Sequence, residues 1–339
     1  MINAAIVGLG RWGRRLVDSV QKDGLPLGSK VRFSRAVVRT VSTAREYAAS
    51  QRLTLTTSID DALADKSVDA IVLATPHAEH PSQIIAVADA NKHVFVEKPL
   101  AFRLADAEAA LSRAERKNVV LAIGYNRRFL PATRKLKEGI AAGSFGDLLR
   151  LEGNFSNNAG LNYREGMWRA TEGGAKAALS AMGVHILDLF IYLFGPIDKV
   201  RTTSTRRSMP VAADDVVSVD LTFENGAVGT LTSILTTPRL WRVQVFGTLQ
   251  WAHMRDEHLL DMCDGSGTVE AWSFEIVDTV RLELEAFADA ISGKSSYPVS
   301  AAEALHGAAV LEAMLESAAN GGTPVAVPQI SGEVAHFSH

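Results

Sequence analysis

The chain has 339 residues, of which 47% are hydrophobic and 22% are charged. This length and apolar content are sufficient for about two domains with well-buried cores. The formal net charge is −3 at pH 7, and basic residues come in short runs such as Arg14-Arg15 and Arg127-Arg128. Because neither feature gives a continuous positive surface, we expect no nucleic-acid partner.

The sequence also argues against disulfides, metal sites and membrane segments. Cys263 is the single cysteine, which excludes an internal disulfide or a multi-cysteine metal site and is typical of a reducing compartment. His77 and His80 lack a third ligand of suitable spacing, so no metal is expected. We find neither a leader of the signal-peptide type nor an apolar run of about 18 residues. We therefore expect a cytoplasmic protein without a membrane partner.

The chain opens with an apolar run, a glycine-rich turn and a helix-compatible segment. Ala4–Val7 contains no turn residue and is followed by Gly8-Leu9-Gly10-Arg11-Trp12-Gly13. In this setting the G-x-G-x-x-G pattern indicates a dinucleotide site. Gly8 permits the tight turn, Gly10 lets a diphosphate approach the backbone, and Gly13 allows the helix to pack closely on the strand. The diphosphate would accept hydrogen bonds from unpaired N–H groups at the start of the helix.

Up to about residue 123, short apolar strands alternate with helical patterns. We expect strands at Ala4–Val7, Ser34–Val38, Ala70–Ala74, Val94–Val96 and Val119–Ile123. We expect helices at Arg11–Lys22, Ser42–Ser50, Ile59–Ala64, Pro81–Ala90 and Leu104–Arg116. This alternation predicts right-handed βαβ units in a parallel, doubly wound Rossmann sheet with helices on both faces.

Beyond residue 123 the pattern changes to strands joined by short turns. We expect strands at Leu148–Phe155, Lys199–Arg207, Asp215–Phe223, Ala227–Leu235 and Leu240–Phe246. We expect helices at Pro131–Ala142, Ala177–Leu193, Val280–Ile291 and Ala301–Ala319. We therefore predict a dinucleotide-binding domain at residues 1–122 and an α+β domain at residues 123–339, with a large, mostly antiparallel open sheet.

The second strand, Ser34–Val38, is followed by Arg39-Thr40. A dinucleotide fold often has an acidic residue here that binds the ribose 2′-hydroxyl, but the next acidic residue is Glu46. Because an arginine attracts a 2′-phosphate that a carboxylate would repel, we expect Arg39 and Thr40 to favour NADP(H), with NAD(H) as the alternative cofactor. Arg39 facing solvent, or stacking on adenine, is the competing interpretation.

Two later strands end in polar residues on the side of the sheet that lines the ligand crevice. Thr75 and Pro76 follow one of them and would border the ribose and nicotinamide. Glu97-Lys98-Pro99 follows the next. The Lys98 ammonium can donate a hydrogen bond to a substrate oxygen, and a positioned acid–base group contributes about 10²–10⁴-fold in rate. A surface lysine paired with Glu97 is the alternative.

With these residues, the chain resembles the Gfo/Idh/MocA oxidoreductases, the group of glucose–fructose oxidoreductase and inositol dehydrogenase. Glu97-Lys98-Pro99 in its setting is the most specific of the matches. The matching segments, in family order, are Gly8–Gly13, Ala74–Pro76 with His80, Lys92–Ala101, Tyr125–Phe129, Trp168-Arg169, Gly173–Ala175 and Gly183–Asp188. The remainder fits the family architecture but carries weak motifs.

The resemblance implies a role for each matched residue. Lys98 and His185 would be catalytic, Lys98 by hydrogen-bonding the reacting oxygen and His185 as its partner acid or base. The substrate would be bound by Lys98, Asn126, Arg127, Trp168 and His185, with Arg127 preferred to Arg128. Together with the glycine turn and the end of the second strand, the resemblance gives the expected cofactor-binding residues. They are Gly8, Leu9, Gly10, Arg11, Trp12, Gly13, Arg39, Thr40, Ala74, Thr75, Pro76, His80, Glu97, Lys98, Trp168 and Arg169.

One position departs from the family pattern. The family usually carries Asp-x-Gly-x-His, whereas this chain has Ala181-Met182-Gly183-Val184-His185. Residues four apart share a face of an α-helix, so the usual acid and histidine would point into one site. Ser180 would point about 100° away. A substrate hydroxyl therefore loses a hydrogen-bond acceptor here. A buried structural histidine is the alternative interpretation of His185.

The sequence thus predicts an NADP(H)-dependent oxidoreductase that transfers hydride to or from the hydroxyl or carbonyl carbon of a sugar, polyol, inositol or related cyclic substrate. A non-sugar ketone or aldehyde is an alternative because of Ala181. A non-catalytic NADP-binding sensor and an enzyme that retains its cofactor through alternate oxidation and reduction are rival hypotheses. From the resemblance, we expect a homodimer or homotetramer formed through the C-terminal sheet.

Overall fold

The computed structural model describes residues 1–171 and 174–330, which form two compact units. The first unit comprises Met1–Asn126 and Asp278–Leu305. The second comprises Arg127–Val277 and the described residues from His306 onward. The chain therefore crosses from one unit to the other more than once.

The first unit is built on a six-stranded parallel sheet in the order β5-β4-β1-β6-β7-β8. Its strands are β1 (Ile2–Val7), β4 (Val31–Val37), β5 (Thr54–Thr56), β6 (Ala70–Leu73), β7 (His93–Val96) and β8 (Leu121–Ile123). A separate hairpin pairs β2 (Gln21–Lys22) with β3 (Leu25–Pro26). The strand order reverses between β1 and β6, as in doubly wound dinucleotide folds, and this confirms the predicted fold class.

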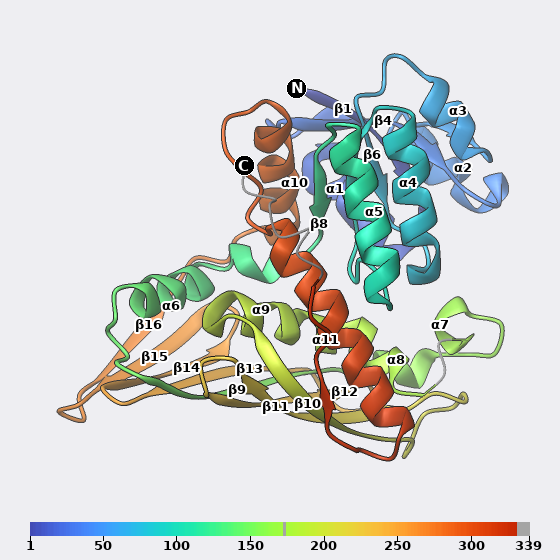
Figure 1. The fold of residues 1–339 in the computed structure, drawn as a ribbon. Coiled ribbons are helices and arrows are strands. Elements are labelled where there is room, and N and C mark those ends of the chain that lie inside the picture. Colours follow the sequence, from blue (N-terminus) through green and yellow to red (C-terminus); the bar gives the residue numbers. More distant parts are fainter. Residues whose placement is uncertain (172–173, 331–339) are drawn as a thin grey trace. The chain divides into compact units, whose positions relative to one another are not determined.

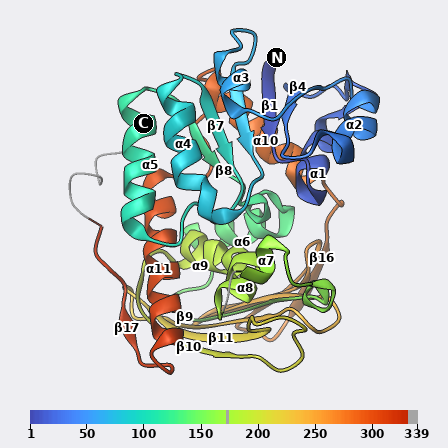
Figure 2. The ribbon, with the colours of Figure 1, turned by 90° about the vertical axis from the view of Figure 1, so that its right-hand side faces the viewer.

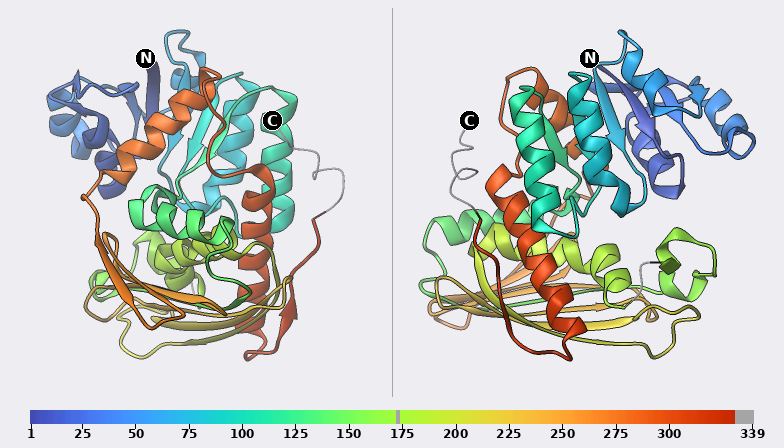
Figure 3. Two further views of the ribbon diagram at one scale, coloured as in Figure 1. Left: turned by 90° about the vertical axis from the view of Figure 1, so that its left-hand side faces the viewer. Right: turned by 45° about the vertical axis from the view of Figure 1, so that its right-hand side comes forward.

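Helices cover both faces of this sheet (Figure 1). They are α1 (Arg11–Val20), α2 (Val41–Ser50), α3 (Ile59–Ala64), α4 (His80–Asp89), α5 (Leu104–Arg116) and α10 (Thr279–Ile291), with a 3₁₀ turn η1 (His77–Glu79). Helices α4 and α5 lie side by side on one face. Helices α1 and α10 lie together on the other (Figure 3). Side chains of β1 alternate between the two faces of the sheet. Ala4 and Ile6 are on the face that packs against α1 and α10.

Helix α10 changes the expected domain division. Its Val280, Leu284 and Phe287 are buried in the core of the first unit, where the Phe287 ring meets Phe95 of β7 edge-on at 5.8 Å. The segment Asp278–Leu305 therefore groups with the first unit, although we expected residues 123–339 to form one domain. The sequence pattern of α10 predicts a helix but does not reveal which sheet it covers.

The second unit is built on a nine-stranded sheet in the order β16-β15-β14-β13-β9-β12-β11-β10-β17. The β9–β12 pair is parallel, and the other neighbouring pairs are antiparallel. The strands are β9 (Leu148–Ser156), β10 (Ile197–Thr205), β11 (Val216–Phe223), β12 (Val228–Ile234), β13 (Leu240–Gly247), β14 (Gln250–Asp256), β15 (Leu259–Asp264), β16 (Val269–Ser273) and β17 (Val325–Ala326). The predicted large, mostly antiparallel sheet is confirmed.

Helices cover one face of this second sheet (Figure 2). The helical elements are the 3₁₀ turns η2 (Asn126–Phe129) and η3 (Ala159–Asn162), α6 (Pro131–Ala141), α7 (Trp168–Thr171), α8 (Lys176–Ala178), the π turn η4 (Leu179–Gly183), α9 (Val184–Phe194) and α11 (Ala301–Ala319). Alternation buries Val217, Val219 and Leu221 of β11 while Asp220 is exposed. One face of the sheet is therefore buried and apolar. The opposite face is exposed and mixed, because Val228, Leu240 and Trp251 are exposed on the other strands.

The segment Lys176–Phe194 was expected to be one α-helix over Ala177–Leu193. It consists instead of α8, the π turn and α9. An 18-residue window of this 19-residue segment has a mean hydropathy of 1.8, which by length and composition alone would allow a membrane crossing. Of the window that gives this value, 89% is buried within the protein. The segment packs against β9 and β12 as a core element of the second unit.

Candidate active site

The three glycines of the first turn have different neighbours. Gly8 has φ +98°, and a Cβ there would lie 2.5 Å from the Ala74 carbonyl oxygen. A Cβ on Gly13 would lie 1.9 Å from the Gly8 carbonyl oxygen. Both positions therefore require glycine because backbone atoms approach closely. A Cβ on Gly10 would meet nothing within 4 Å, so this glycine borders open space rather than protein.

Helix α1 begins at this open space. Its N-cap is Gly10, which offers no side-chain hydrogen bond, and the first turn has no acidic residue. The first N–H groups of the helix thus remain available to an anion. A surface hollow of about 630 Å³ is lined by Leu9, Gly10, Arg11, Arg14, Arg15 and Asp18. Open space at Gly10, donor N–H groups and nearby arginines fit the diphosphate of a dinucleotide.

The end of β4 is positively charged. Arg39 and Thr40 are exposed, and Arg39 makes no hydrogen bond or ion pair within the described part of the chain. Nearby, the Arg14 guanidinium lies 4.8 Å from the centroid of the Tyr47 ring and donates to the Thr43 carbonyl at 3.1 Å. Tyr47 donates to Asp18 at 2.7 Å, and burial, followed by Asp18, raises the pKa of its phenol. Arg14 is thus held in place, whereas Arg39 is available to a ligand.

The ends of β6 and β7 carry the expected polar residues of the first unit. Thr75, Pro76 and Lys98 are half-buried, and the Lys98–Pro99 peptide is cis. Glu97 is buried, and a Cβ on Gly124 would lie 3.0 Å from its Oε1, so the carboxylate packs against the backbone after β8. Lys98 is therefore on the same sheet edge as the glycine turn, where the carboxyl ends of the parallel strands meet.

His80, which was expected to be among the cofactor-binding residues, has no exposed surface. Its Nδ1 lies 2.8 Å from the Pro99 carbonyl oxygen, and its Nε2 lies 3.2 Å from the Thr75 carbonyl oxygen. Burial, followed by the charge of His77, lowers the pKa of His80 to about 3. The imidazole is therefore neutral at pH 7 and lies between the loops that follow β6 and β7.

In the second unit, His185 is the second residue of α9 and is only 6% exposed. Its ring lies 5.7 Å from that of Phe155 on β9, and Phe155 meets Trp241 of β13 edge-on at 5.0 Å. Phe155 and Trp241 are direct partners in the β9–β13 register. Arg127 stacks over both rings at 5.3 and 5.4 Å and pairs with Glu257 at 3.0 Å. The Phe155 ring therefore contacts the imidazole and is itself packed against Trp241 and the Arg127 guanidinium.

A buried ion pair fixes α9 one turn beyond His185. Arg128 Nε lies 3.0 Å from each carboxylate oxygen of Asp188, and Arg128 Nη2 lies 2.7 Å from Oδ1. The two side chains are 2% and 4% exposed, and the guanidinium also stacks on Tyr192 at 4.7 Å. Burying a charged pair is favourable only when several hydrogen bonds join the two groups, as they do here. We therefore assign Arg128 a structural role, whereas Arg127 is more exposed.

The π turn changes the relation between Ala181 and His185. Val184 donates its N–H to the Leu179 carbonyl, a step of five residues rather than the four of an α-helix. The expectation that residues four apart share one face therefore does not hold across η4, and neither does the 100° estimate for Ser180. Ser180 has no exposed surface and Ala181 is 5% exposed. No carboxylate replaces the family acid at position 181.

The remaining predicted residues are Trp168, Arg169 and Asn126. Trp168 and Arg169 are on the short helix α7, and the Arg169 guanidinium lies 4.2 Å from the centroid of the Trp168 ring. Gly173 of the matching glycine segment lies outside the described residues. Asn126 is buried, and its Oδ1 makes no hydrogen bond within the described part of the chain. Over residues 1–171 and 174–330, no group of three or more His, Cys, Asp or Glu side chains could hold a metal.

Sequence reasoning missed the residues that support the site in the second unit. It assigned no role to Asp188, although Asp188 lies in a matching segment, and it assigned none to Phe155, Trp241 or Glu257. Two apolar aromatic residues in separate strands give no local signal of their pairing. A charged residue such as Asp188 in the otherwise apolar Ile186–Phe194 is a signal that a buried partner exists.

Comparison with known proteins identifies the family. Residues 2–125 match the model of an oxidoreductase family with an NAD-binding Rossmann fold, GFO_IDH_MocA, and residues 133–253 match the GFO/IDH/MocA C-terminal domain. The chain belongs to the GFO/IDH/MocA oxidoreductase family. The predicted membership is thus confirmed, and the chain is an NAD(P)-binding dehydrogenase or reductase.

Three relatives illustrate the range of this oxidoreductase family. The 4-carboxy-2-hydroxymuconate-6-semialdehyde dehydrogenase of Sphingobium sp. is 30% identical, over 67% of this chain and 70% of that protein. The glucose-6-phosphate 3-dehydrogenase of Bacillus subtilis is 27% identical over 62% and 64%. The crystal structure of a putative NADPH-dependent oxidoreductase from Desulfitobacterium hafniense has a TM-score of 0.86 at 26% identity, over 96% and 98% of the two chains.

Proposed function

We propose that this oxidoreductase uses NADP(H) to interconvert a hydroxyl and a carbonyl group on a small cyclic substrate, with Lys98 as the hydrogen-bond donor and proton carrier. The observation that carries the proposal is the position of Lys98 in the first unit. Lys98 follows β7 on the sheet edge where the turn at Gly8 follows β1 and borders open space at Gly10. The proposed cofactor site and the proposed proton donor then lie at the same edge of one sheet.

Each residue has a defined task in this proposal. The nicotinamide, when bound, supplies or accepts the hydride. The Lys98 ammonium donates a hydrogen bond to a carbonyl oxygen and thereby stabilises negative charge as it develops. In the oxidative direction, the neutral amine of Lys98 accepts the hydroxyl proton. His185 assists as a second acid or base, held on α9 by its ring contact with Phe155. Arg127 is a candidate for substrate contact because it is less buried than Arg128.

The preference for NADP(H) is supported by the end of β4. Arg39 is exposed and has no partner in residues 1–171 and 174–330, and no carboxylate follows the strand before Glu46. A 2′-phosphate would accept charge-assisted hydrogen bonds from Arg39, whereas the 2′-hydroxyl of NAD(H) would lack its usual carboxylate acceptor.

Two observations support the proposed substrate class: the substrates named for the relatives, and the alanine at position 181. Glucose-6-phosphate 3-dehydrogenase is named for a sugar substrate, and the 4-carboxy-2-hydroxymuconate-6-semialdehyde dehydrogenase for a non-sugar aldehyde. A polyhydroxylated ring needs hydrogen-bond acceptors for its hydroxyl groups, and position 181 provides none through its side chain. We propose a cyclic substrate in which one hydroxyl or carbonyl group reacts and fewer neighbouring hydroxyl groups require recognition.

A substrate panel tests this function. Protein is mixed with NADPH and aldoses, keto-sugars, inosones and cyclic ketones, and with NADP⁺ and the corresponding alcohols, while the absorbance of the reduced cofactor is followed. We expect turnover with at least one cyclic compound and a higher kcat/KM with NADP(H) than with NAD(H). Tight NADPH binding without turnover across the panel would contradict the enzyme and favour the sensor hypothesis.

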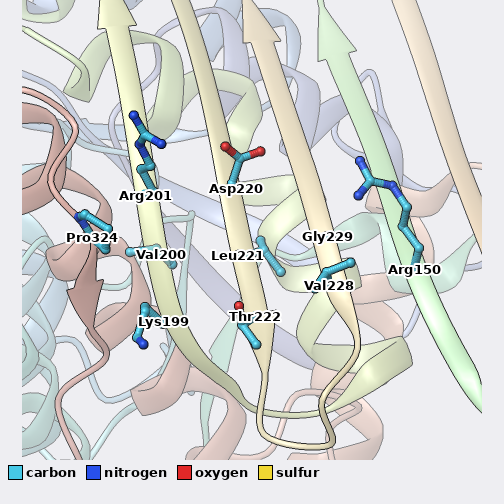
Figure 4. Close-up of a pocket in the computed structure, with 10 residues that line it drawn as sticks. All are labelled: Arg150, Lys199, Val200, Arg201, Asp220, Leu221, Thr222, Val228, Gly229 and Pro324. Carbon is cyan, nitrogen blue, oxygen red and sulfur yellow. The ribbon is translucent and has the colours of Figure 1, made fainter.

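We also propose that the protein forms a homodimer or homotetramer through the exposed face of the second sheet, and that it works in the cytoplasm. A hollow of about 350 Å³ on that face is bordered by Arg150, Lys199, Arg201, Asp220 and Val228, among others (Figure 4). Arginine and aspartate side chains on neighbouring strands can pair with their equivalents across a two-fold axis. Light scattering coupled to size exclusion tests this, and a monomer would contradict it.

A further inference from the structure

The loops that follow β6 and β7 are connected by a single buried side chain. His80, the first residue of α4, is fully buried between them. One ring nitrogen faces the carbonyl of Pro99, the residue after Lys98, and the other faces the carbonyl of Thr75. His80 therefore contacts the backbone of both loops at the sheet edge where we place Lys98 and the cofactor. Its own side chain is not exposed at that edge.

The two distances from the His80 ring indicate whether it donates to the loop after β6 or to the loop after β7. A neutral imidazole carries one N–H, and both of its neighbours here are acceptors. The contact from Nδ1 to Pro99 is the shorter, 2.8 Å against 3.2 Å for Nε2 to Thr75. The proton therefore belongs on Nδ1, where it donates to the Pro99 carbonyl. The Thr75 loop has a separate connection, because the Thr75 hydroxyl donates to Gln83 Oε1 at 2.6 Å.

We propose that His80 is a positioning residue for Lys98: through the hydrogen bond from Nδ1 to the Pro99 carbonyl, it fixes the backbone that carries the Lys98 ammonium. This inference rests on the proposed role of Lys98 and adds the group that sets its orientation. His80 does not touch cofactor or substrate. Its removal would leave the dinucleotide site formed by the glycine turn intact but would allow the Lys98 side chain to move.

Three substitutions separate the hydrogen bond from packing. In His80→Asn, the amide nitrogen occupies nearly the position of Nδ1 and can donate to Pro99. In His80→Gln, the amide reaches the position of Nε2 near Thr75 instead. His80→Leu fills the space without a donor. Gln83→Ala is the matched control, because it removes the partner of Thr75 on the same helix without affecting the Pro99 carbonyl.

The principal readout needs no substrate. Each protein is labelled with a trace of acetic anhydride, and mass spectrometry gives the acetylation rate of Lys98 relative to the exposed Lys66. We expect His80→Gln and His80→Leu to raise this ratio about three- to tenfold, because the lysine is released from a fixed backbone. His80→Asn and Gln83→Ala should retain the wild-type ratio. NADPH affinity should change less than about threefold in all four variants.

Turnover provides the second readout. With the panel compound that the wild type converts, kcat should fall about 10- to 100-fold in His80→Gln and His80→Leu, while KM for NADPH stays nearly constant. Unchanged labelling in folded His80→Gln and His80→Leu would overturn the inference. A labelling ratio of His80→Asn clearly above that of the wild type would also overturn it, and this outcome remains informative if the other variants do not fold. Because labelling does not depend on turnover, an inactive panel would contradict the proposed function but not this result.

Discussion

The candidate residues of the two units are fixed in different ways. In the first unit the glycine turn is determined by backbone contacts, since Gly8 and Gly13 each leave no room for a Cβ. In the second unit His185 depends on side chains from distant parts of the chain. Phe155 lies beside it and packs on Trp241, and Arg128 binds Asp188 one turn away. Backbone-determined geometry is visible in a local motif, whereas geometry that depends on remote side chains is not.

The largest effect is expected from breaking the ion pair of the second unit. Arg128→Met leaves the Asp188 carboxylate buried without its bidentate partner, which should lower the free energy of unfolding by about 3–5 kcal/mol. Urea denaturation measures the change. Arg127→Met is the matched control, because its pair with Glu257 is less buried, at 15% and 24% exposed. Loss of this pair and of the contacts with Phe155 and Trp241 should cost only about 1–2 kcal/mol. Equal decreases in the free energy of unfolding for the two variants would contradict a special structural role of the Arg128–Asp188 pair.

The second effect tests the proposed contact of Arg39 in the first unit with the 2′-phosphate of the cofactor. Arg39→Ala should weaken NADPH binding by about 1.5–3 kcal/mol, the range for hydrogen bonds to charged groups. NADH binding should change little, because NADH has no 2′-phosphate. Calorimetric titration with both cofactors gives the comparison. A similar loss for NADH would indicate that Arg39 contacts adenine instead of selecting the phosphate.

A third comparison tests whether two glycines of the Gly8–Gly13 turn have different roles, one in stability and the other in NADPH binding. Gly13→Ala places a methyl group against the Gly8 carbonyl and should destabilise the fold by about 1–3 kcal/mol. Gly10→Ala has open space and should leave stability unchanged while weakening NADPH binding about tenfold, or about 1.4 kcal/mol. Thermal unfolding and NADPH titration of both variants decide the matter. If Gly10→Ala bound NADPH normally, the open space would not be the diphosphate site.

The smallest effect concerns another remote pair of the second unit. His306 of α11 accepts the Ile197 N–H at 2.8 Å through Nε2, and burial lowers its pKa to about 4. Because the unfolded chain binds the proton first, with a pKa of about 6.5, this part of the stability is present above pH 6.5 and is lost as the pH falls toward 4. Between pH 7 and pH 5 the wild type should lose about 1–2 kcal/mol from this group.

His306→Gln supplies the control for that prediction, because its amide oxygen can accept the same N–H without titrating. Urea denaturation at pH 7 and pH 5 should therefore show a smaller difference for His306→Gln than for the wild type. An identical pH dependence in both proteins would mean that His306 does not contribute.

The sequence predicted the first unit well and the second unit in part. The glycine turn, most strands of the parallel sheet and helices α3 and α5 follow from local patterns, and α3 and α5 have the predicted bounds. The short β5, with a single apolar residue between two threonines, carries too little apolar signal. Strands β14 to β16 were missed because β14 buries only Ala252 and Met254 and β16 buries no residue. Their pairing with neighbouring strands, rather than a local apolar pattern, defines them. The π turn at Leu179–Gly183 also has no local signal in an apolar segment.

Lys98→Met tests the central claim most directly, with Lys66→Met as the control for loss of a lysine elsewhere. The account predicts that NADPH binds Lys98→Met within about threefold of its wild-type affinity, while kcat with the panel substrate falls about 10²–10⁴-fold. Lys66→Met should match the wild type in both respects. Undiminished turnover by Lys98→Met would contradict the account.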